Sequence, residues 1–183
     1  MEHETDAFRL ATDVFATSWL IEGFAHGDEV GNWALPAVFE AYAEVPALEL
    51  GSEYDDGSGA TAPTVAKALI RILANFTETA GDCFFAVWEG YAGLPDAPLG
   101  ARFKLPPQRD MVLLRGPIES AQASFEVPPT NRRPVRWWPA DREWCVGADI
   151  YSRELTIGGS VACIAAVLAS TKLNARSVSP VTD

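Results

Sequence analysis

The last third of the chain constrains the fold most, because two strands, a turn and a helix follow one another there directly. Residues 144–150 alternate between large apolar and smaller or polar side chains, which is the period of a half-buried strand. Residues 151–154 suit a hairpin turn, and residues 155–157 return as the partner strand. Two glycines end that strand, and Ser160 can cap a helix that ends near residue 169. A hairpin of this kind predicts antiparallel pairing.

Helical and strand patterns recur earlier in the chain. Residues 5–20 have the apolar spacing of an amphipathic helix, and a second short helix is predicted over residues 37–43, directly after a proline. Residues 62–78 form the clearest helix, with Lys67 and Arg71 on the face opposite its apolar stripe. Further strands are predicted over residues 83–88, 111–114 and 175–178. The other segments predict a short helix or loop (118–125) and irregular structure (51–60, 93–109 and 127–134).

This order of elements has no regular strand–helix–strand alternation, which argues against a parallel sheet. We expect an α+β fold, with a mainly antiparallel sheet of about four to six strands and helices packed against it as a single pair of layers. A length of 183 residues is typical of one domain. Within residues 1–183 we expect an acidic helical part (1–60), a sheet-and-helix part (61–178) and a frayed tail (179–183).

The net charge of −11 is concentrated in the first third of the chain. Residues 1–60 hold thirteen acidic residues and a single basic one, Arg9. Affinity for nucleic acid comes from Lys and Arg that neutralise phosphates, so we expect no nucleic acid as a partner. The acidic third is either a solvated face or a docking face for a basic partner, which electrostatic attraction would steer.

Cysteine, histidine and targeting signals are sparse. Cys83, Cys145 and Cys163 lie in apolar runs without a C-x-x-C pair, and the histidines are His3 and His26. These residues suit neither a zinc site nor a disulfide framework, so we expect buried free thiols and neither a metal nor a cofactor. The amino terminus has no secretory pattern, and the longest apolar run has nine residues, against about 20 for a membrane span. We expect a cytoplasmic protein with no membrane partner.

A first candidate site is the segment VWEGYAG, where a predicted strand meets a loop. Strand ends often carry functional side chains, and Glu89 could act there as a general acid, a general base or a hydrogen-bond acceptor. In the alternative interpretation, Trp88 and Tyr91 belong to the core and Glu89 pairs with an arginine.

A second candidate is WWPADREW, which has three tryptophans in eight residues. Trp138, Asp141 and Arg142 could hold a planar or cationic small molecule by stacking and cation–π contact. The alternative is a structural turn in which salt bridges of Asp141 and Arg142 lock the entry to the next strand.

Two further segments suggest anion binding less specifically. The strand–Gly158-Gly159–helix junction offers free backbone N–H groups, although such glycines are more often tight turns. Arg132, Arg133 and Arg136 could bind phosphate, but we expect them to contact the acidic first third of the same chain.

Three ordered segments, FFAVWEGYAG, FKLPPQRDMVLLRGP and WWPADREWCVGADIYSRELTIGGS, resemble a family of small uncharacterised proteins from high-GC bacteria. That family has a W-x-G-Y segment, an R-x-[YM]-x-L-x-x-G strand and a WWP-x-DR-x-W-x-V…D…T-x-x-GGS hairpin-to-helix, over residues 60–170 here. The resemblance brings no assigned activity. It implies motif positions at Trp88, Gly90, Tyr91, Arg109, Trp138, Asp141, Arg142, Gly158, Gly159 and Ser160.

These observations favour a non-catalytic binding or interaction protein, regulatory or immunity-like, whose partner is a basic protein or a second copy of the chain. The reason is that no recognisable nucleophile–base pair or metal-ligand set is present. The alternative is a small-molecule binder or enzyme, in which Glu89 is the acid–base candidate and Arg109 or Arg142 binds an anionic group. Its aromatic pocket would be formed by Trp88, Glu89, Tyr91, Arg109, Trp138, Asp141 and Arg142.

Overall fold

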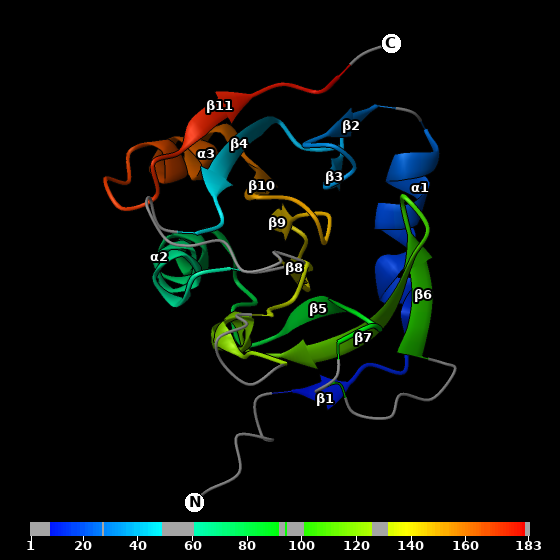
Figure 1. Cartoon of the computed structure of the whole chain (residues 1–183). Coiled ribbons are helices and arrows are strands. Elements are labelled where there is room, and N and C mark those ends of the chain that lie inside the picture. The colour runs from blue at the N-terminus through cyan, green and yellow to red at the C-terminus, as the bar shows by residue number, and fades with distance from the viewer. Residues whose placement is uncertain are drawn as a thin grey trace, which may run out of the picture.

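The computed structural model describes residues 8–26, 28–48, 61–91, 94, 101–125 and 132–181. Its centre is one nine-stranded antiparallel sheet that takes strands from both ends of the chain (Figure 1). The strands are, in spatial order, β1 (Arg9–Leu10), β7 (Arg109–Gly116), β5 (Cys83–Trp88), β8 (Arg136–Pro139), β9 (Trp144–Gly147), β10 (Glu154–Gly159), β4 (Ala41–Pro46) and β11 (Arg176–Val178). The ninth strand, β6 (Arg102–Leu105), pairs with β7 on the same edge as β1.

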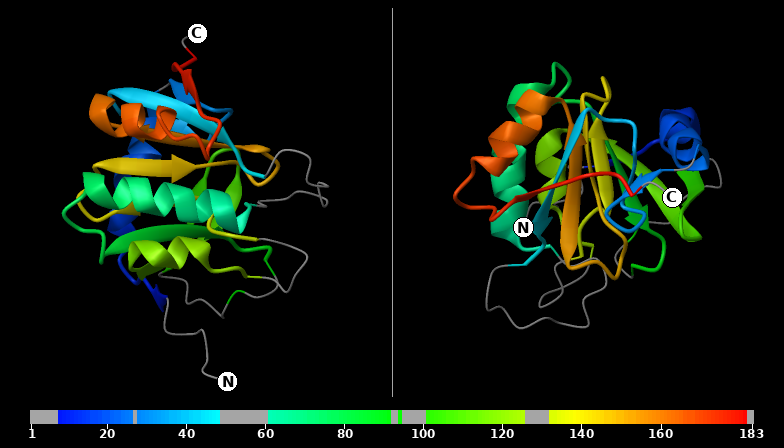
Figure 2. Two further views of the ribbon diagram at one scale, coloured as in Figure 1. Left: turned by 90° about the vertical axis from the view of Figure 1, so that its left-hand side faces the viewer. Right: turned by 90° about the horizontal axis from the view of Figure 1, so that it is seen from above.

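Helices cover both faces of this sheet (Figure 2). α2 (Pro63–Leu73) and α3 (Val161–Leu168) lie on one face. α1 (Ser18–Ala25) and a small hairpin of β2 (Glu29–Val30) and β3 (Leu35–Pro36) lie on the other. The short 3₁₀ helices are η2 (Val14–Thr17), η3 (Ala74–Phe76) and η5 (Ile118–Gln122).

Side chains that alternate along β8 pack against the helical layers on both faces of the sheet. Trp137 lines a small cavity with Ala66 and Leu69 of α2, whereas the Trp138 ring packs edge-on against Trp19 of α1, with 5.8 Å between ring centroids. Neighbouring strand residues point to opposite faces, so each tryptophan is buried under a different layer. The expectation of a single pair of layers is therefore wrong.

The α+β class and the mainly antiparallel sheet are confirmed, but nine strands exceed the predicted four to six. α2, β5, β7, the β9–β10 hairpin, α3 and β11 lie where the sequence placed them. The predicted cap of α3 also forms, because the Ser160 Oγ accepts a hydrogen bond from the Cys163 N–H at 3.2 Å.

The first third of the chain is less helical than predicted. Residues 5–20 do not form one helix: η2 covers Val14–Thr17 and α1 begins only at Ser18, while residues 1–7 lie outside the described part. The predicted helix over residues 37–43 is wrong, because Ala41–Pro46 is strand β4 between β10 and β11. Pairing with strands from the far end of the chain decides this segment, and a local helical preference cannot compete with two strand partners.

Three smaller expectations also change. Residues 93–109 are not irregular throughout, since they contain β6, and β8 is a strand that the sequence did not predict. The tail is not wholly frayed, because the Val181 N–H donates to the Glu29 carbonyl at 3.0 Å. The predicted loop over residues 51–60 and the last two residues lie outside the described part.

Candidate functional site

The seven residues predicted to form an aromatic pocket lie at two opposite ends of β5. Trp88 pairs with Met111 at one end, where Glu89, Tyr91 and Arg109 also lie. At the other end, Cys83 pairs with Pro139, and Trp138, Asp141 and Arg142 belong to β8 or follow it directly. None of the seven lines the small cavity beneath α2 or the groove between α2 and residues 170–174. The structure therefore does not bring them together in one pocket.

At the first end, the aromatic and acidic side chains have partners. The Trp88 ring packs edge-on against Tyr91, with 5.6 Å between centroids, and Tyr91 is buried. Glu89 forms an ion pair with Arg102, 2.8 Å from Oε1 to Nη1. This is the arrangement of the alternative interpretation, with Trp88 and Tyr91 in or against the core.

Arg109 at this end forms a nearly buried bidentate ion pair with Asp149. The Nε–Oδ1 distance is 2.9 Å and the Nη2–Oδ2 distance is 3.1 Å, and the Tyr151 ring lies 5.1 Å from the guanidinium carbon. Burial alone would raise the pKa of Asp149, but the hydrogen bonds and charge of Arg109 outweigh it and hold that pKa below its ordinary value. The pair connects β7 to the β9–β10 loop and therefore stabilises the fold.

At the second end, Asp141 connects the β8–β9 turn to the segment that follows η3. Its Oδ2 accepts hydrogen bonds from the Thr77 hydroxyl at 2.7 Å and from the Glu78 N–H at 2.9 Å. Trp138 is almost fully buried between Trp19 and Phe84. Arg142 is exposed and has a left-handed backbone, with φ of 61°. Hydrogen bonds, and not the salt bridges considered from the sequence, therefore lock this turn.

The α3 N-terminus is occupied by the chain itself. The Glu40 Oε2 accepts a hydrogen bond from the Val161 N–H at 3.1 Å, beside the Ser160 cap. A carboxylate is a favourable partner for this positive end of a helix. Gly158 and Gly159 belong to β10 and do not form a separate anion-binding loop.

In the arginine run after residue 131, Arg133 and Arg136 donate hydrogen bonds to carbonyl oxygens. Arg136 is 0% exposed, and it donates from Nε to Ala34 O at 2.8 Å and from Nη2 to Trp33 O at 2.5 Å. Burial lowers its pKa to about 10. Arg133 donates to Gln122 O and Thr61 O. Arg136 therefore does reach the first third of the chain, but through backbone oxygens and not through the expected carboxylates.

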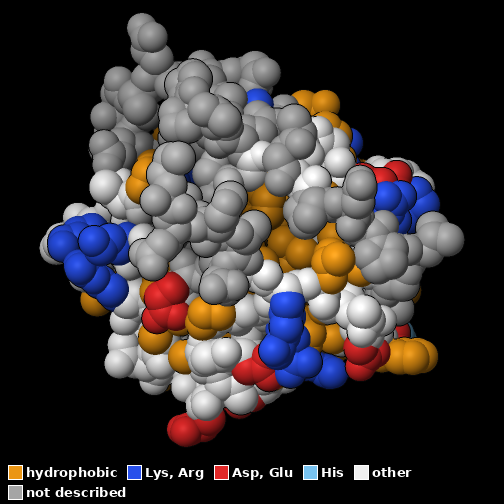
Figure 3. Space-filling view, turned by 90° about the horizontal axis from the view of Figure 1, so that it is seen from below, with side chains coloured by type: hydrophobic (Ala, Val, Ile, Leu, Met, Phe, Trp, Pro, Cys, Tyr) orange, Lys and Arg blue, Asp and Glu red, His pale blue; other side chains and the backbone are white. Residues whose placement is uncertain are grey.

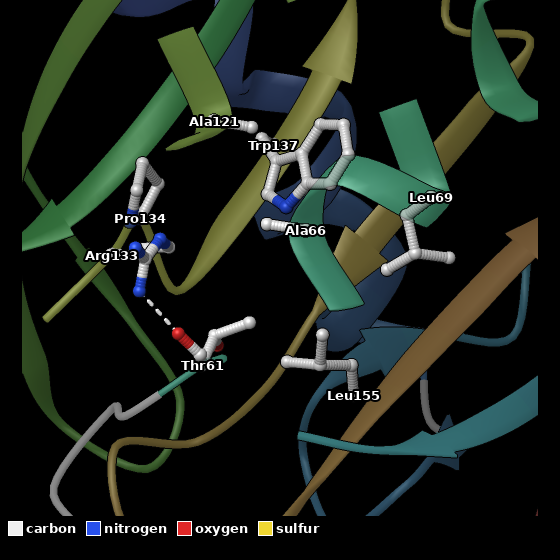
Figure 4. Close-up of a pocket in the computed structure, with 8 residues that line it drawn as sticks. All are labelled: Thr61, Ala66, Leu69, Ala121, Arg133, Pro134, Trp137 and Leu155. Atoms are coloured by element: carbon white, nitrogen blue, oxygen red, sulfur yellow. Dashed lines mark hydrogen bonds between the residues drawn. The ribbon is translucent and has the colours of Figure 1, made fainter. Parts of the chain in front are cut away.

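The cavity beneath α2 has room for about one water molecule. Its volume is about 10 Å³, close to the smallest space that holds a water. Trp137, Leu69 and the aliphatic part of Arg133 border it, and Arg133 reaches across to the Thr61 carbonyl (Figure 4). This space is a packing defect and is too small for a ligand.

Charges at the β1 edge of the sheet are paired. Arg115 forms a bidentate ion pair with Asp82, with both distances 2.5 Å, and Arg9 Nη2 lies 3.9 Å from the same carboxylate. Basic and acidic side chains lie next to one another on the side of the molecule seen in Figure 3. This edge therefore presents no field of one sign.

A different surface lies over α1 and the β2–β3 hairpin. Phe15, one turn before α1, is 80% exposed, and Val38, just after β3, is 52% exposed. Ile21 of α1 and Trp33 of the β2–β3 turn are also exposed. Exposed apolar side chains are one mark of an interaction surface. We call these four side chains, together with three carboxylates described next, the α1 face.

The three carboxylates of the α1 face are Asp13, Glu22 and Asp28, all exposed. No ion pair involves any of them within the described ranges. The reason is visible in the sequence, since Arg9 is the one basic residue before Lys67. The α1 face therefore combines exposed apolar groups with exposed carboxylates, of which Asp13 also caps η2 and helps to raise the pKa of Arg115.

Tertiary contacts join α1 to the β2–β3 hairpin and to Val38, which follows it. A Cβ built on Gly23 of α1 would lie 3.2 Å from Val38 Cγ1, and the Phe24 and Trp33 ring centroids are 6.3 Å apart. Trp33 has a left-handed backbone with φ of 67°, a conformation that costs a bulky residue about 1–3 kcal/mol. The hydrogen bond from buried Arg136 to the Trp33 carbonyl helps to hold this turn in place.

The cysteines have structural positions. Cys83, Cys145 and Cys163 are buried free thiols, as predicted. Burial raises the pKa of Cys83 to about 12 and that of Cys163 to about 11, and it raises the pKa of Cys145 as well. A thiol with a raised pKa is a poor nucleophile near neutral pH. Across the described segments, no three His, Cys, Asp or Glu side chains lie close enough together to hold a metal ion.

Among the helices that the structure describes, none has the length and apolar character needed to cross a membrane. Comparison with protein-family models, with curated proteins and with solved structures gives no match in any of the three cases. The resemblance of residues 60–170 to an uncharacterised bacterial family therefore stays a prediction.

Proposed function

We propose that this chain is a non-catalytic interaction protein that docks a basic partner on the α1 face. The observation that carries the proposal is that residues 13–38 hold four exposed apolar side chains and three exposed carboxylates without ion-pair partners among the described residues. Burial of apolar area favours association, and the affinity is what remains after the entropy costs of binding. The carboxylates select a partner of positive charge and increase the rate of encounter.

The polar groups considered for catalysis support this proposal over the enzyme alternative. Glu89 is paired with Arg102, and Arg109 is paired with Asp149. Asp141 accepts hydrogen bonds from the Thr77 hydroxyl and from the N–H groups of Glu78 and Glu143. A general acid or base must reach a substrate proton, and these groups already serve internal contacts. A regulatory or immunity-like role requires only a stable surface, which the β2–β3 hairpin and α1 provide.

The test uses a synthetic peptide of about 20 residues with Lys and Leu at amphipathic helical spacing, labelled for fluorescence anisotropy. We expect the full chain to bind this peptide and to bind it more weakly at about 300 mM than at about 50 mM NaCl, because salt screens the attraction. The triple variant Asp13→Asn, Glu22→Gln, Asp28→Asn should bind about tenfold more weakly, since three exposed charge pairs contribute about 0.2–1 kcal/mol each.

A matched control is the triple variant Glu78→Gln, Glu119→Gln, Glu143→Gln. It removes the same number of exposed negative charges away from the α1 face, so it should keep affinity within about twofold. Equal weakening in both triple variants would mean that only net charge attracts the peptide, and the proposal would be wrong. The double variant Ile21→Ser, Val38→Ser tests how much the apolar side chains contribute to affinity for the peptide, because it leaves the charge unchanged.

A further inference from the structure

An open groove lies on the other side of the sheet, between α2 and the segment that follows α3. Its volume is about 700 Å³, within the range of known ligand sites of about 300–1,000 Å³. Val65, Ala68 and Ile72 of α2 provide an apolar floor, together with Leu48 and Leu173. The groove is thus large and apolar enough to receive side chains of another molecule.

The charged side chains of this groove all have the same sign. Lys67 and Arg71 project from successive turns of α2, and Lys172 comes from the segment opposite. All three are exposed, and no ion pair involves them in the part of the chain that the structure describes. No acidic residue is among the described lining residues. Among the residues that the structure describes, this groove is therefore basic, in a chain of net charge −11.

The outer side of α3 extends this groove with apolar surface. α3 has the sequence VACIAAVL, without a charged or polar side chain other than its cysteine. Cys163, Ile164 and Val167 face inward, but Val161 is 62% exposed and Leu168 is also exposed. A helix that is apolar all round is normally buried all round. Leu168 lies two residues before Ser170, where the chain begins to line the groove, so the carboxyl end of α3 adjoins the groove. Val161 lies at the other end of α3, where its N–H donates to the Glu40 carboxylate.

We propose that α3 and the adjoining basic groove together bind an acidic peptide segment with apolar side chains. Its apolar residues would cover Val161 and Leu168 and enter the groove, while its carboxylates would pair with Lys67, Arg71 and Lys172. α2 and α3 run side by side across this face (Figure 2), so a bound segment could contact both helices. A peptide helix laid in an apolar groove is a recurrent mode of recognition.

The composition of the groove favours a peptide over a nucleic acid. None of the described lining residues is aromatic, whereas proteins that bind single strands stack bases on aromatic rings. Three cations also neutralise few phosphates, so binding to a nucleic acid would be weak at physiological salt. The exposed apolar side of α3, by contrast, matches the apolar half of an amphipathic peptide.

The experiment measures fluorescence anisotropy of a labelled synthetic peptide of about 20 residues with Glu and Leu at amphipathic helical spacing. The full chain should bind it, and the triple variant Lys67→Gln, Arg71→Gln, Lys172→Gln should bind it about tenfold more weakly. The double variant Val161→Ser, Leu168→Ser should weaken binding about three- to tenfold without a change of charge. Both sets of side chains are exposed, so the fold should persist, which circular dichroism checks.

The matched control is the triple variant Arg102→Gln, Lys104→Gln, Arg142→Gln, which removes three exposed positive charges elsewhere. It should keep affinity within about twofold. Equal loss in both triple variants, or no loss in the α3 double variant, would overturn the proposal. Tighter binding of a single-stranded oligonucleotide than of the peptide would also overturn it.

A second copy of the chain is the remaining occupant to exclude. Sedimentation velocity at about 5 and about 100 µM measures self-association in the range typical of weak contacts. Association that disappears in the Lys67, Arg71 and Lys172 variant would assign the groove to a second copy and contradict the proposal. The peptide used here is acidic and the one used for the α1 face is basic, so failure of one proposal is distinguishable from failure of the other.

Discussion

Arg115 and Arg136 come from strands of the same sheet but bind opposite kinds of partner. Arg115 is half-buried and pairs with the carboxylate of Asp82. Arg136 is fully buried and donates to the carbonyl oxygens of Trp33 and Ala34, and at 3.4 Å to that of Pro106. Its Nη1 has no partner among the described atoms. A buried cation without a carboxylate is costly, so its hydrogen bonds must offset that cost locally.

We predict that Arg136→Met lowers the free energy of unfolding by about 2–4 kcal/mol, because it leaves three carbonyl oxygens without a donor while it removes the cost of burying a charge. Arg136→Lys should also destabilise the protein, since one ammonium group cannot replace the planar guanidinium fork. Urea denaturation followed by tryptophan fluorescence measures both changes. Exposed Arg102→Met is the control and should change stability by less than about 1 kcal/mol. Full stability of Arg136→Lys would show that the fork is unimportant.

At the scale of elements, small residues on one sheet face decide how closely the β2–β3 hairpin approaches. Gly147 of β9 lies opposite Thr156 of β10. A Cβ at Gly147 would lie 2.5 Å from the Ala34 carbonyl oxygen and 2.7 Å from Leu35 Cδ2. Because a backbone atom is the neighbour, a rotamer change cannot relieve the contact. The absence of a side chain at Gly147 thus lets the hairpin, and with it Trp33 of the α1 face, lie flat on the sheet.

We predict that Gly147→Ala destabilises the protein by about 2–4 kcal/mol, because the added methyl group pushes the hairpin away from the sheet. Thermal denaturation measured by circular dichroism should show a clear decrease in Tm. Gly81→Ala provides the comparison, since a Cβ there has no neighbour within 4 Å, and it should change stability by less than about 0.5 kcal/mol. The same Tm for both variants would mean that the hairpin adapts without strain.

At the scale of the whole molecule, exposed charges without an ion-pair partner among the described residues occur on both sides of the sheet. The α1 face carries Asp13, Glu22 and Asp28, and the groove on the opposite side carries Lys67, Arg71 and Lys172. Three carboxylates with lowered pKa values connect separate parts of the fold. Asp82 pairs with Arg115, Asp149 pairs with Arg109, and Asp141 accepts hydrogen bonds from the segment before β5. Internal ion pairs and hydrogen bonds therefore contribute stability that depends on pH.

We predict that stability decreases in acid and that Asp149→Asn reduces this decrease. A carboxyl group whose pKa is lower in the folded state adds stability above its unfolded pKa of about 3.9, and this stability is lost as the pH falls through the folded pKa. The variant should lose about 1–3 kcal/mol at about pH 7, since it breaks a largely buried pair. It should then change less between about pH 5 and about pH 3 than the wild type. Urea unfolding across this range tests it, and parallel curves would contradict it.

Local patterns in the sequence predicted the elements that pack by their own periodicity. The stripe of α2, the strand β5, the β9–β10 hairpin and the Ser160 cap of α3 each involve residues a few positions apart, and each is confirmed. The burial of the cysteines followed in the same way from their apolar neighbours. The sequence could not show whether the residues of the candidate pocket lie together. Trp88 and Trp138 both lie in aromatic, apolar stretches of sequence, but the fold places them at opposite ends of β5.

The sequence by itself thus determined the antiparallel α+β class, the principal helices of the sheet's α2–α3 face and the excess of acid in the first third of the chain. Only the tertiary structure decided that residues 41–46 form a strand, that both sheet faces are covered, and which charges remain unpaired. The physical reason is distance along the chain. Strand β4 needs β10 and β11 as partners, and Arg136 donates to a carbonyl 102 residues away. Contacts between residues so far apart produce no periodic pattern among residues that are close in the sequence.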